Sequence, residues 1–236
     1  MCHNNAVNAL PAPGPYQMRK TNGLKYWQYE GEQSGMQKRL AIITDIYGCN
    51  PFYQGFATYF AKHGWTVYLI DLFSDLGELK EITREAAFVR RHKLRDHDTC
   101  DQLQTFIAEQ GIDAVIGFCL GGNFVFELAK RGVNTNLVAF YPFPAGLPNQ
   151  DEIDVPFEYL ETLNKSVTVL VGDSDDSSGR ENIARLVQIG TGNPVLDVHV
   201  YAGSGHGFLE DLDSTDEALR TNAEKSLATC MQAVAI

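Results

Sequence analysis

The sequence predicts an α/β fold, in which a mostly parallel, twisted sheet is covered by helices on both faces. Short apolar segments of strand character alternate along the chain with longer segments of helical periodicity, the pattern of parallel strands joined by crossover helices. The 236 residues suffice for one large core, and neither an internal repeat nor a linker divides them. We therefore expect a single α/β domain over residues 1–236.

The expected elements follow one another in a regular order. Residues 1–15 are rich in Asn, Ala and Pro, which predicts a poorly ordered N-terminal arm. Apolar, β-branched and aromatic content predicts strands over residues 24–30, 39–44, 65–70, 114–116, 136–141, 166–171 and 195–201. Amphipathic spacing predicts helices over residues 52–63, 81–110, 124–131, 180–189 and 214–233.

Local signals refine three helix boundaries. The stretch 81–110 is long for one helix, so we expect a break near 96–98, where Asp98 can cap a second helix. Gly132 is a typical C-terminal stop for the helix before it. The sequence Ser214-x-x-Glu217 is a capping box, which predicts the start of the last helix.

The central motif is Gly117-x-Cys119-x-Gly121, which lies between a predicted strand and a predicted helix. It is the nucleophile-elbow pattern with cysteine in place of serine. Glycines are needed there because so sharp a turn leaves no room for a Cβ beside the nucleophile. The helix N-terminus favours a thiolate at Cys119. The alternative is a buried structural cysteine in a glycine-rich turn.

A histidine and a group of carboxylates follow in the chain order that the elbow requires. His206 lies in a glycine-rich loop directly after the last predicted strand, and Asp173, Asp175 and Asp176 follow the strand 166–171. Ligand sites of such sheets form at the carboxyl ends of the strands. The order nucleophile, acid, histidine is that of α/β hydrolases. The residues alone do not decide whether Asp175 or Asp173 is the acid. The alternative is that this stretch is only a solvated acidic turn.

At this point the chain resembles the dienelactone hydrolase family, from about residue 39 to its C-terminus. The resemblance lies in three segments, which read Asp-Ile-Tyr-Gly at 45–48, Gly-Phe-Cys-Leu-Gly-Gly at 117–122 and Gly-His-Gly-Phe at 205–208. It implies an α/β-hydrolase fold and a Cys119, Asp175, His206 triad. Asp175 is favoured because the family's aspartate closes a Gly-x-x-Asp turn after a strand, about thirty residues before the histidine.

Further roles follow from the motif and the resemblance. The N–H groups of Leu120 and Ile46 are expected to form the oxyanion hole. Asp45 stands where the family has an acidic residue, usually Glu, that interacts with the resting thiol; a loop residue that bonds its own backbone is an equal alternative. Tyr47, Tyr141, Phe143 and Phe208 are expected to line an apolar pocket, although each also suits the core.

One departure concerns the substrate. Family members that act on dienelactone itself hold its carboxylate with arginines, one of them shortly after the histidine, whereas residues 207–211 here read Gly-Phe-Leu-Glu-Asp. Arg84, Arg90 and Arg91 could supply a cation, but a solvated helix face is the favoured interpretation of all three. The family therefore fits this sequence better than its namesake substrate does.

The function predicted is hydrolysis of a small lactone or carboxylic ester through a Cys119 acyl-enzyme, without a metal or an organic cofactor. The formal net charge of −11 argues against nucleic acid and anionic membranes as partners. Five cysteines without paired spacing, and the lack of a signal peptide or an apolar span, favour the cytoplasm. A monomer and a homo-oligomer stay equally open.

Two alternatives belong beside this prediction. The first is a thioester hydrolase, or another acyl hydrolase or transferase, on the same scaffold. The second is a non-catalytic binding protein of the α/β-hydrolase type, since a fold does not fix a function. A dinucleotide-binding domain is disfavoured, because Gly117-x-Cys119-x-Gly121-Gly122 does not match the pattern G-x-G-x-x-G.

Overall fold

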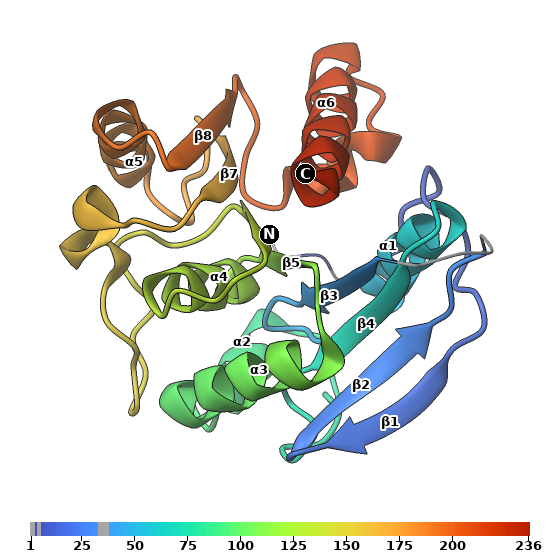
Figure 1. The fold of residues 1–236 in the computed structure, drawn as a ribbon. Helices are drawn as coiled ribbons and strands as arrows, with labels where there is room; N and C mark the ends of the chain where they lie inside the picture. Colours follow the sequence, from blue (N-terminus) through green and yellow to red (C-terminus); the bar gives the residue numbers. More distant parts are fainter. Residues whose placement is uncertain (1–2, 4–5, 33–37) are drawn as a thin grey trace.

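An eight-stranded sheet forms the centre of the structure, a computed structural model that describes residues 3, 6–32 and 38–236 (Figure 1). The strand order is β1-β2-β4-β3-β5-β6-β7-β8. The pairs from β4 to β8 are parallel, and β1 and β2 form an antiparallel edge. The strands are β1 (Gln17–Thr21), β2 (Leu24–Tyr29), β3 (Arg39–Ile43), β4 (Thr66–Asp71), β5 (Ala114–Phe118), β6 (Asn136–Phe140), β7 (Val167–Gly172) and β8 (Leu196–Tyr201).

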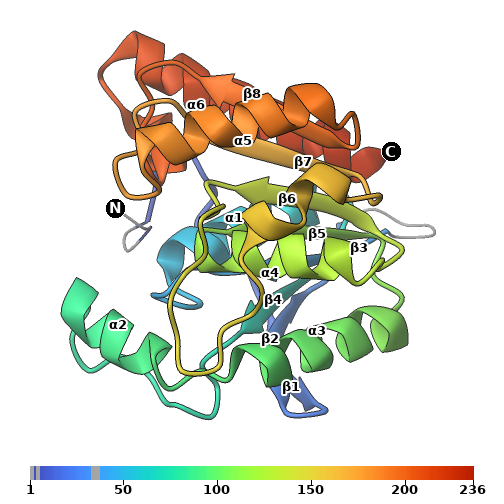
Figure 2. The same cartoon turned by 90° about the vertical axis from the view of Figure 1, so that its left-hand side faces the viewer.

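Helices cover both faces of this sheet, as expected (Figures 1 and 2). The α-helices are α1 (Pro51–Lys62), α2 (Arg84–Arg91), α3 (Asp96–Gln110), α4 (Leu120–Lys130), α5 (Arg180–Gly192) and α6 (Glu217–Ala235). Short 3-10 turns span Pro156–Glu158, Leu160–Thr162 and Phe208–Asp213. One core cluster joins the sheet to α3, α4 and α5, and a second joins it to α1 and α6. None of the described helices is both long and apolar enough to cross a bilayer.

The central strand β5 is buried along its whole length, which explains its continuous apolar sequence. It ends at Phe118. The next residue, Cys119, has φ 55° and ψ −112°, and α4 begins directly after it. A Cβ on Gly117 would lie 2.1 Å from the carbonyl oxygen of Gly121, so the turn excludes a side chain there. The elbow geometry predicted from the motif is therefore present.

Two predicted helix starts differ from the structure. The break in the stretch 81–110 falls at residues 92–95, and α3 begins at Asp96, so Asp98 lies in its first turn and caps nothing. In the last helix the cap is Asp216, whose carboxylate accepts hydrogen bonds from the N–H groups of Ala218 and Leu219. Ser214 instead closes the preceding 3-10 turn, and two further residues separate it from α6.

The N-terminal segment packs more closely than its composition suggested. Residues 1–2 and 4–5 of the expected arm lie outside the described residues. The described part forms no helix or strand before β1, but Val7 and Leu10 are buried in the cluster that contains α1 and α6. His3 is also buried, with its ring stacked on Phe52 of α1 at a centroid distance of 3.7 Å. At these residues the segment covers the core.

Candidate active site

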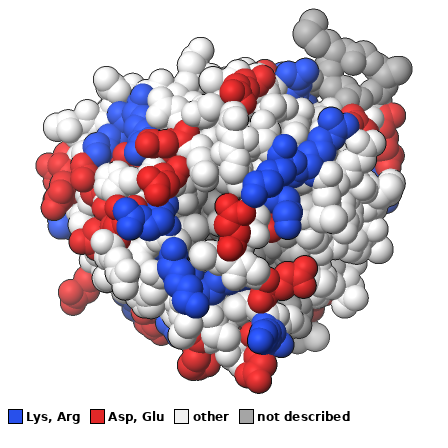
Figure 3. All heavy atoms as spheres, turned by 90° about the horizontal axis from the view of Figure 1, so that it is seen from below, with Lys and Arg blue, Asp and Glu red and all other residues white. Residues whose placement is uncertain are grey.

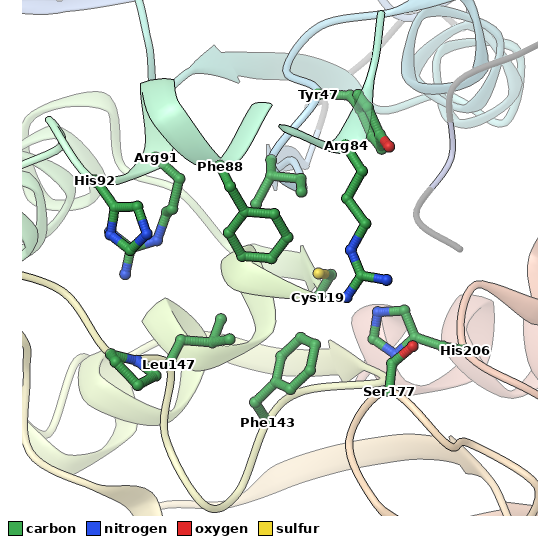
Figure 4. A pocket seen from close by; sticks show the side chains of 12 residues that line it. Tyr47, Arg84, Phe88, Arg91, His92, Cys119, Phe143, Leu147, Ser177 and His206 are labelled. Atoms are coloured by element: carbon green, nitrogen blue, oxygen red, sulfur yellow. The ribbon is translucent and has the colours of Figure 1, made fainter. Parts of the chain in front are cut away.

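Cys119, Asp175 and His206 lie beyond the carboxyl ends of three parallel strands, β5, β7 and β8. The structure brings all three together. Cys119 and His206 line the same cavity, and Figure 4 shows the cysteine sulfur and the imidazole ring on adjoining walls. Asp175 lies behind the ring, so that the order from the cavity outward is cysteine, histidine, aspartate.

The His206–Asp175 contact is a buried hydrogen bond. Nδ1 of His206 lies 2.8 Å from Oδ2 of Asp175. The other carboxylate oxygen accepts the N–H groups of Ser177 and Ser178, each at 2.9 Å. Burial by itself would raise the pKa of Asp175, but the hydrogen bond and charge of His206 and the bonds from Ser178 outweigh it and lower that pKa. Asp175 is thus an oriented, ionised partner for the imidazole.

The other two acids of this turn have hydrogen-bond and ion-pair partners other than His206. Asp173 is exposed, and its Oδ1 accepts the N–H of Gly203 at 2.7 Å, which ties the loop after β7 to the loop after β8. Asp176 is exposed and pairs with Arg180 of α5 at 2.7 Å. Neither acid has a hydrogen bond to His206, so the geometry separates Asp175 from the runner-up, Asp173.

Cys119 sits at the N-terminus of α4 with only 2 % of its surface exposed. Its positive φ is rare for a residue with a side chain, and such strain concentrates at functional sites. Three other described cysteines, the half-buried Cys49 and the buried Cys100 and Cys230, lie in surroundings that raise the pKa of each thiol. Of these four cysteines, the elbow cysteine is the one that lines the cavity shared with His206.

The loop after β3 carries the second half of the expected oxyanion hole. Asp45 is fully buried, and its Oδ1 accepts the N–H of Tyr47 at 2.7 Å, which is the backbone contact that one interpretation expected. The carbonyl of Ile46 accepts a hydrogen bond from Arg90 at 2.9 Å. Leu120 is the first residue of α4, where N–H groups have no acceptor within the helix. Ile46 and Cys119 line one cavity.

That cavity has a volume of about 260 Å³ and walls from three parts of the chain (Figure 4). The strand ends supply its catalytic side, α2 with His92 supplies a second wall, and the loop after β6 supplies the third. The lining residues are Ile46, Tyr47, Arg84, Phe88, Arg91, His92, Cys119, Phe143, Leu147, Pro148, Ser177 and His206. The size suits a small molecule, and the walls are mostly apolar.

The predicted pocket residues divide into two groups. Tyr47 lines the cavity, but Tyr141 and Phe208 do not, which corrects the expectation for both. They are buried behind the histidine: the Tyr141 ring lies 5.1 Å from the His206 ring, and Phe208 packs on Tyr141 at 5.6 Å. Phe143 lines the cavity, whereas sequence reasoning missed two further apolar wall residues, Phe88 and Leu147. The spacing Arg84-x-x-x-Phe88 on one helix was the available signal.

The arginines of α2 are the largest departure from expectation. Arg90 and Arg91 are only 9 % and 2 % exposed, so the interpretation as a solvated helix face is wrong for both. Arg91 donates to both carboxylate oxygens of Asp96, at 2.7 and 2.6 Å, and Asn149 of the loop after β6 donates to the same carboxylate at 3.0 Å. Arg84 reaches across the cavity toward Cys119 and His206 (Figure 4).

Charge on the molecular surface is mixed on the face seen from below in Figure 1. Acidic and basic side chains are intermingled over it, and neither sign forms a continuous field (Figure 3). Two arginines of α2 line the cavity: Arg84 is exposed, and Arg91 is buried and paired with Asp96. Arg84 thus places a cation at the cavity of a chain whose formal net charge is −11.

The parallel sheet, the strained cysteine elbow and the later aspartate–histidine pair define an α/β hydrolase. The family model for the dienelactone hydrolase family matches residues 29–234. The chain belongs to the dienelactone hydrolase family and is a hydrolase, which confirms the resemblance drawn from the three sequence segments.

Two characterised relatives and two solved structures agree with this placement. The chain is 50 % identical to carboxymethylenebutenolidase 2 of Cupriavidus pinatubonensis (strain JMP 134 / LMG 1197) over 200 residues, 84 % of each chain. It is 31 % identical to carboxymethylenebutenolidase of Rhodococcus opacus over 222 residues, 90 % of this chain and 87 % of the relative. A candidate dienelactone hydrolase from Klebsiella pneumoniae shares the fold with a TM-score of 0.75, at 18 % identity and covering 91 % and 96 % of the two chains. Esterase 2 of Thermogutta terrifontis has a TM-score of 0.63 at 12 % identity, covering 94 % and 96 %.

Proposed function

We propose that the protein hydrolyses a small lactone that carries a carboxylate, through an acyl-enzyme on Cys119. The observation that carries the proposal is the cavity shared by Cys119, His206 and Arg84. The relatives support it, because their name, carboxymethylenebutenolidase, denotes an enzyme for a butenolide lactone with a carboxymethylene group. A carboxylic ester of similar size and charge would fit the same description.

The first half of the reaction forms a thioester. His206 takes the proton of the Cys119 thiol, and the thiolate sulfur attacks the lactone carbonyl carbon. The N–H groups of Ile46 and Leu120 stabilise the resulting oxyanion, and one such donor is worth about 3–4 kcal/mol. Collapse of the tetrahedral intermediate breaks the ring C–O bond, and the departing oxygen takes the proton back from His206. Asp175 holds the imidazole in the required tautomer and stabilises its charged form.

The second half releases the product. His206 takes a proton from a water molecule, and the hydroxide attacks the thioester carbon in the same oxyanion hole. The C–S bond then breaks, the cysteine sulfur takes the proton from His206, and the opened acid leaves. These steps use only water and the side chains and backbone named above.

Arg84 supplies the proposed contact with the substrate carboxylate. It lines the cavity from the first turn of α2, and its guanidinium extends toward the reacting residues (Figure 4). Guanidinium groups bind carboxylates through paired, charge-assisted hydrogen bonds. Residues 207–211, shortly after the histidine, contain no arginine, so α2 supplies the cation in this proposal.

We also propose that Asp45 modulates the resting thiol, from its buried position in the loop beside the elbow. Gly121 packs directly against the backbone of Ile43 and Thr44, which supports close contact between the two loops. A cytoplasmic location is part of the proposal as well. It is supported by the four described cysteines, which form no disulfide.

The experiment compares two substrates on two variants. A butenolide bearing a carboxylate is compared with its primary amide, which has nearly the same shape without the charge. We expect kcat/KM of Arg84→Gln to fall about 10- to 100-fold on the acid, because one charged hydrogen-bond pair is lost. On the amide it should fall less than threefold. The matched control is Arg19→Gln on the exposed strand β1, which should leave both substrates unchanged. Equal turnover of acid and amide by the wild type would refute the carboxylate requirement.

A further inference from the structure

Arg90 is a buried cation directly behind the loop that follows β3. Its Nη2 donates to the carbonyl of Ile46 at 2.9 Å, and Nη1 donates to the carbonyl of Gly77 at 3.2 Å. The guanidinium also lies over the ring of Phe73, 4.1 Å from its centroid. These contacts come from three separate segments, so the position of the guanidinium is closely fixed.

The peptide unit between Ile46 and Tyr47 is held at both of its polar ends. Arg90 binds its carbonyl oxygen, and the carboxylate of Asp45 accepts its N–H at 2.7 Å. Only the φ and ψ torsions of Ile46 join this plane to the preceding peptide, so holding the plane restricts the directions that the preceding N–H can take. That preceding N–H, on Ile46 itself, is the donor assigned to the oxyanion.

Arg90 does not line the cavity that contains Cys119, whereas Arg84 and Arg91 of the same helix do. It lines instead a second cavity, about 290 Å³, on the other side of Tyr47. Asp45 and Asp71 are the acids whose charges act on it. Arg90 therefore has no route to the substrate except through the loop that it holds.

We propose that Arg90 is a positioning residue for the reaction: by holding the Ile46 carbonyl, it aims the Ile46 N–H at the oxyanion. The proposal rests on the function proposed above. Its charge is balanced by two nearby carboxylates, and its fork supplies two donors and a stacking plane at once, which a lysine cannot do. Loss of the Arg90 side chain should therefore slow the reaction steps in which an oxyanion forms.

Two reactions of Cys119 separate this role from a general structural one. Acylation by p-nitrophenyl acetate passes through a tetrahedral oxyanion and releases p-nitrophenolate. Alkylation by iodoacetamide displaces iodide at a saturated carbon and forms no oxyanion. Both are followed by intact mass spectrometry and peptide mapping, so that labelling of Cys119 is distinguished from labelling of the half-buried Cys49.

The variants are Arg90→Ala and Arg90→Lys, with the exposed Arg180→Ala as the control. We expect the rate of acylation to fall at least tenfold in Arg90→Ala and by less in Arg90→Lys, while alkylation stays within threefold of wild type. Loss of a whole oxyanion donor costs about 10²–10³ in rate, which sets the upper end. Guanidinium ion at millimolar concentration should restore acylation of Arg90→Ala, since the second cavity gives it an entrance, and methylammonium should not.

Each other outcome counts against a particular claim. Equal losses in acylation and alkylation would assign Arg90 a structural role only, and so would recovery by methylammonium as well as by guanidinium. If both variants acylate like the wild type, the positioning role is refuted and the proposed function stands. If the wild type is alkylated at Cys119 but never acylated, the proposed function fails together with the positioning role. Arg90→Lys keeps the charge and decides the matter should Arg90→Ala not fold.

Discussion

Gly121 of the elbow lies against Ile43 so closely that a Cβ on it would be 2.2 Å from the Ile43 carbonyl oxygen. The contact joins the turn of the nucleophile to the strand that leads into the oxyanion loop, backbone to backbone. Gly121→Ala should lower the free energy of unfolding by about 3 kcal/mol, because neither backbone can move aside cheaply. Urea unfolding measures this. Gly192→Ala, where a Cβ meets nothing within 4 Å, is the control and should not destabilise the protein.

Asp175→Asn should reduce kcat about 10⁴-fold, because an amide favours the wrong imidazole tautomer and cannot balance the charged ring. The substitution keeps the shape of a fully buried side chain. Hydrolysis of p-nitrophenyl acetate under saturating conditions measures the effect. The matched control is Asp173→Asn, which should stay within twofold of wild type because an amide oxygen still accepts the Gly203 N–H. A severe loss in Asp173→Asn instead would reverse the choice of acid.

The same carboxylate makes stability depend on acid pH. The pKa of Asp175 is lowered in the folded protein, while an unfolded aspartate titrates near about 3.9. Its contribution to stability is therefore complete above that value and is lost as the pH falls through the lower, folded pKa. Between pH 5 and pH 3 the free energy of unfolding should fall more steeply in the wild type than in Asp175→Asn. Parallel slopes in urea unfolding at several pH values would contradict the shift.

Asp96→Ala should cost about 3–5 kcal/mol of stability, since it leaves the Arg91 guanidinium buried without its counter-charge. The double variant Arg91→Met with Asp96→Ala should recover most of this loss. Asp176→Ala, at an exposed pair with Arg180, is the control and should leave the midpoint of denaturation unchanged. A double variant no more stable than Asp96→Ala would mean that the penalty does not come from the isolated cation.

Asp45→Asn tests the proposed effect on the resting thiol. The amide oxygen can still accept the Tyr47 N–H, so the loop is retained and only the charge is removed. A nearby carboxylate disfavours a thiolate, and its loss should therefore speed alkylation of Cys119 by iodoacetamide at pH 7, about three- to tenfold. Peptide mapping assigns the label to Cys119. An unchanged or slower rate would leave Asp45 as a loop residue only.

The sequence was sufficient for the sheet and the elbow because both have strong local signals. The buried strand β5 is continuously apolar, and the close contacts of Gly117 and Gly121 leave those positions no alternative to glycine. The exposed strand β1 went unpredicted, because its residues Gln17–Thr21 are polar and the antiparallel edge has no core-facing alternation. The buried strands could thus be predicted from the sequence, and this exposed strand could not.

Tyr47 and Phe143 were predicted to line the pocket and do so, but most of its walls could not be predicted because they arise from contacts between distant segments. Arg91 meets Asp96 across the break between α2 and α3, and Asn149 joins them from the loop after β6. Helical periodicity identifies a polar face, but it cannot say whether water or another loop covers that face. The predicted N-cap of α6 was wrong for a simpler reason. Ser214 and Asp216 are both favourable N-cap residues, and the helix begins after the second.

The cavity has two sources that differ in kind. The reacting residues come from the turns and loops that follow β5, β7 and β8, whereas Arg84, Phe88 and Leu147 come from α2 and the loop after β6. Substrate selectivity and the reaction chemistry therefore depend on different segments of the chain. Substitutions at Arg84, Phe88 or Leu147 should therefore alter which lactone is accepted while leaving the nucleophile and its partners in place.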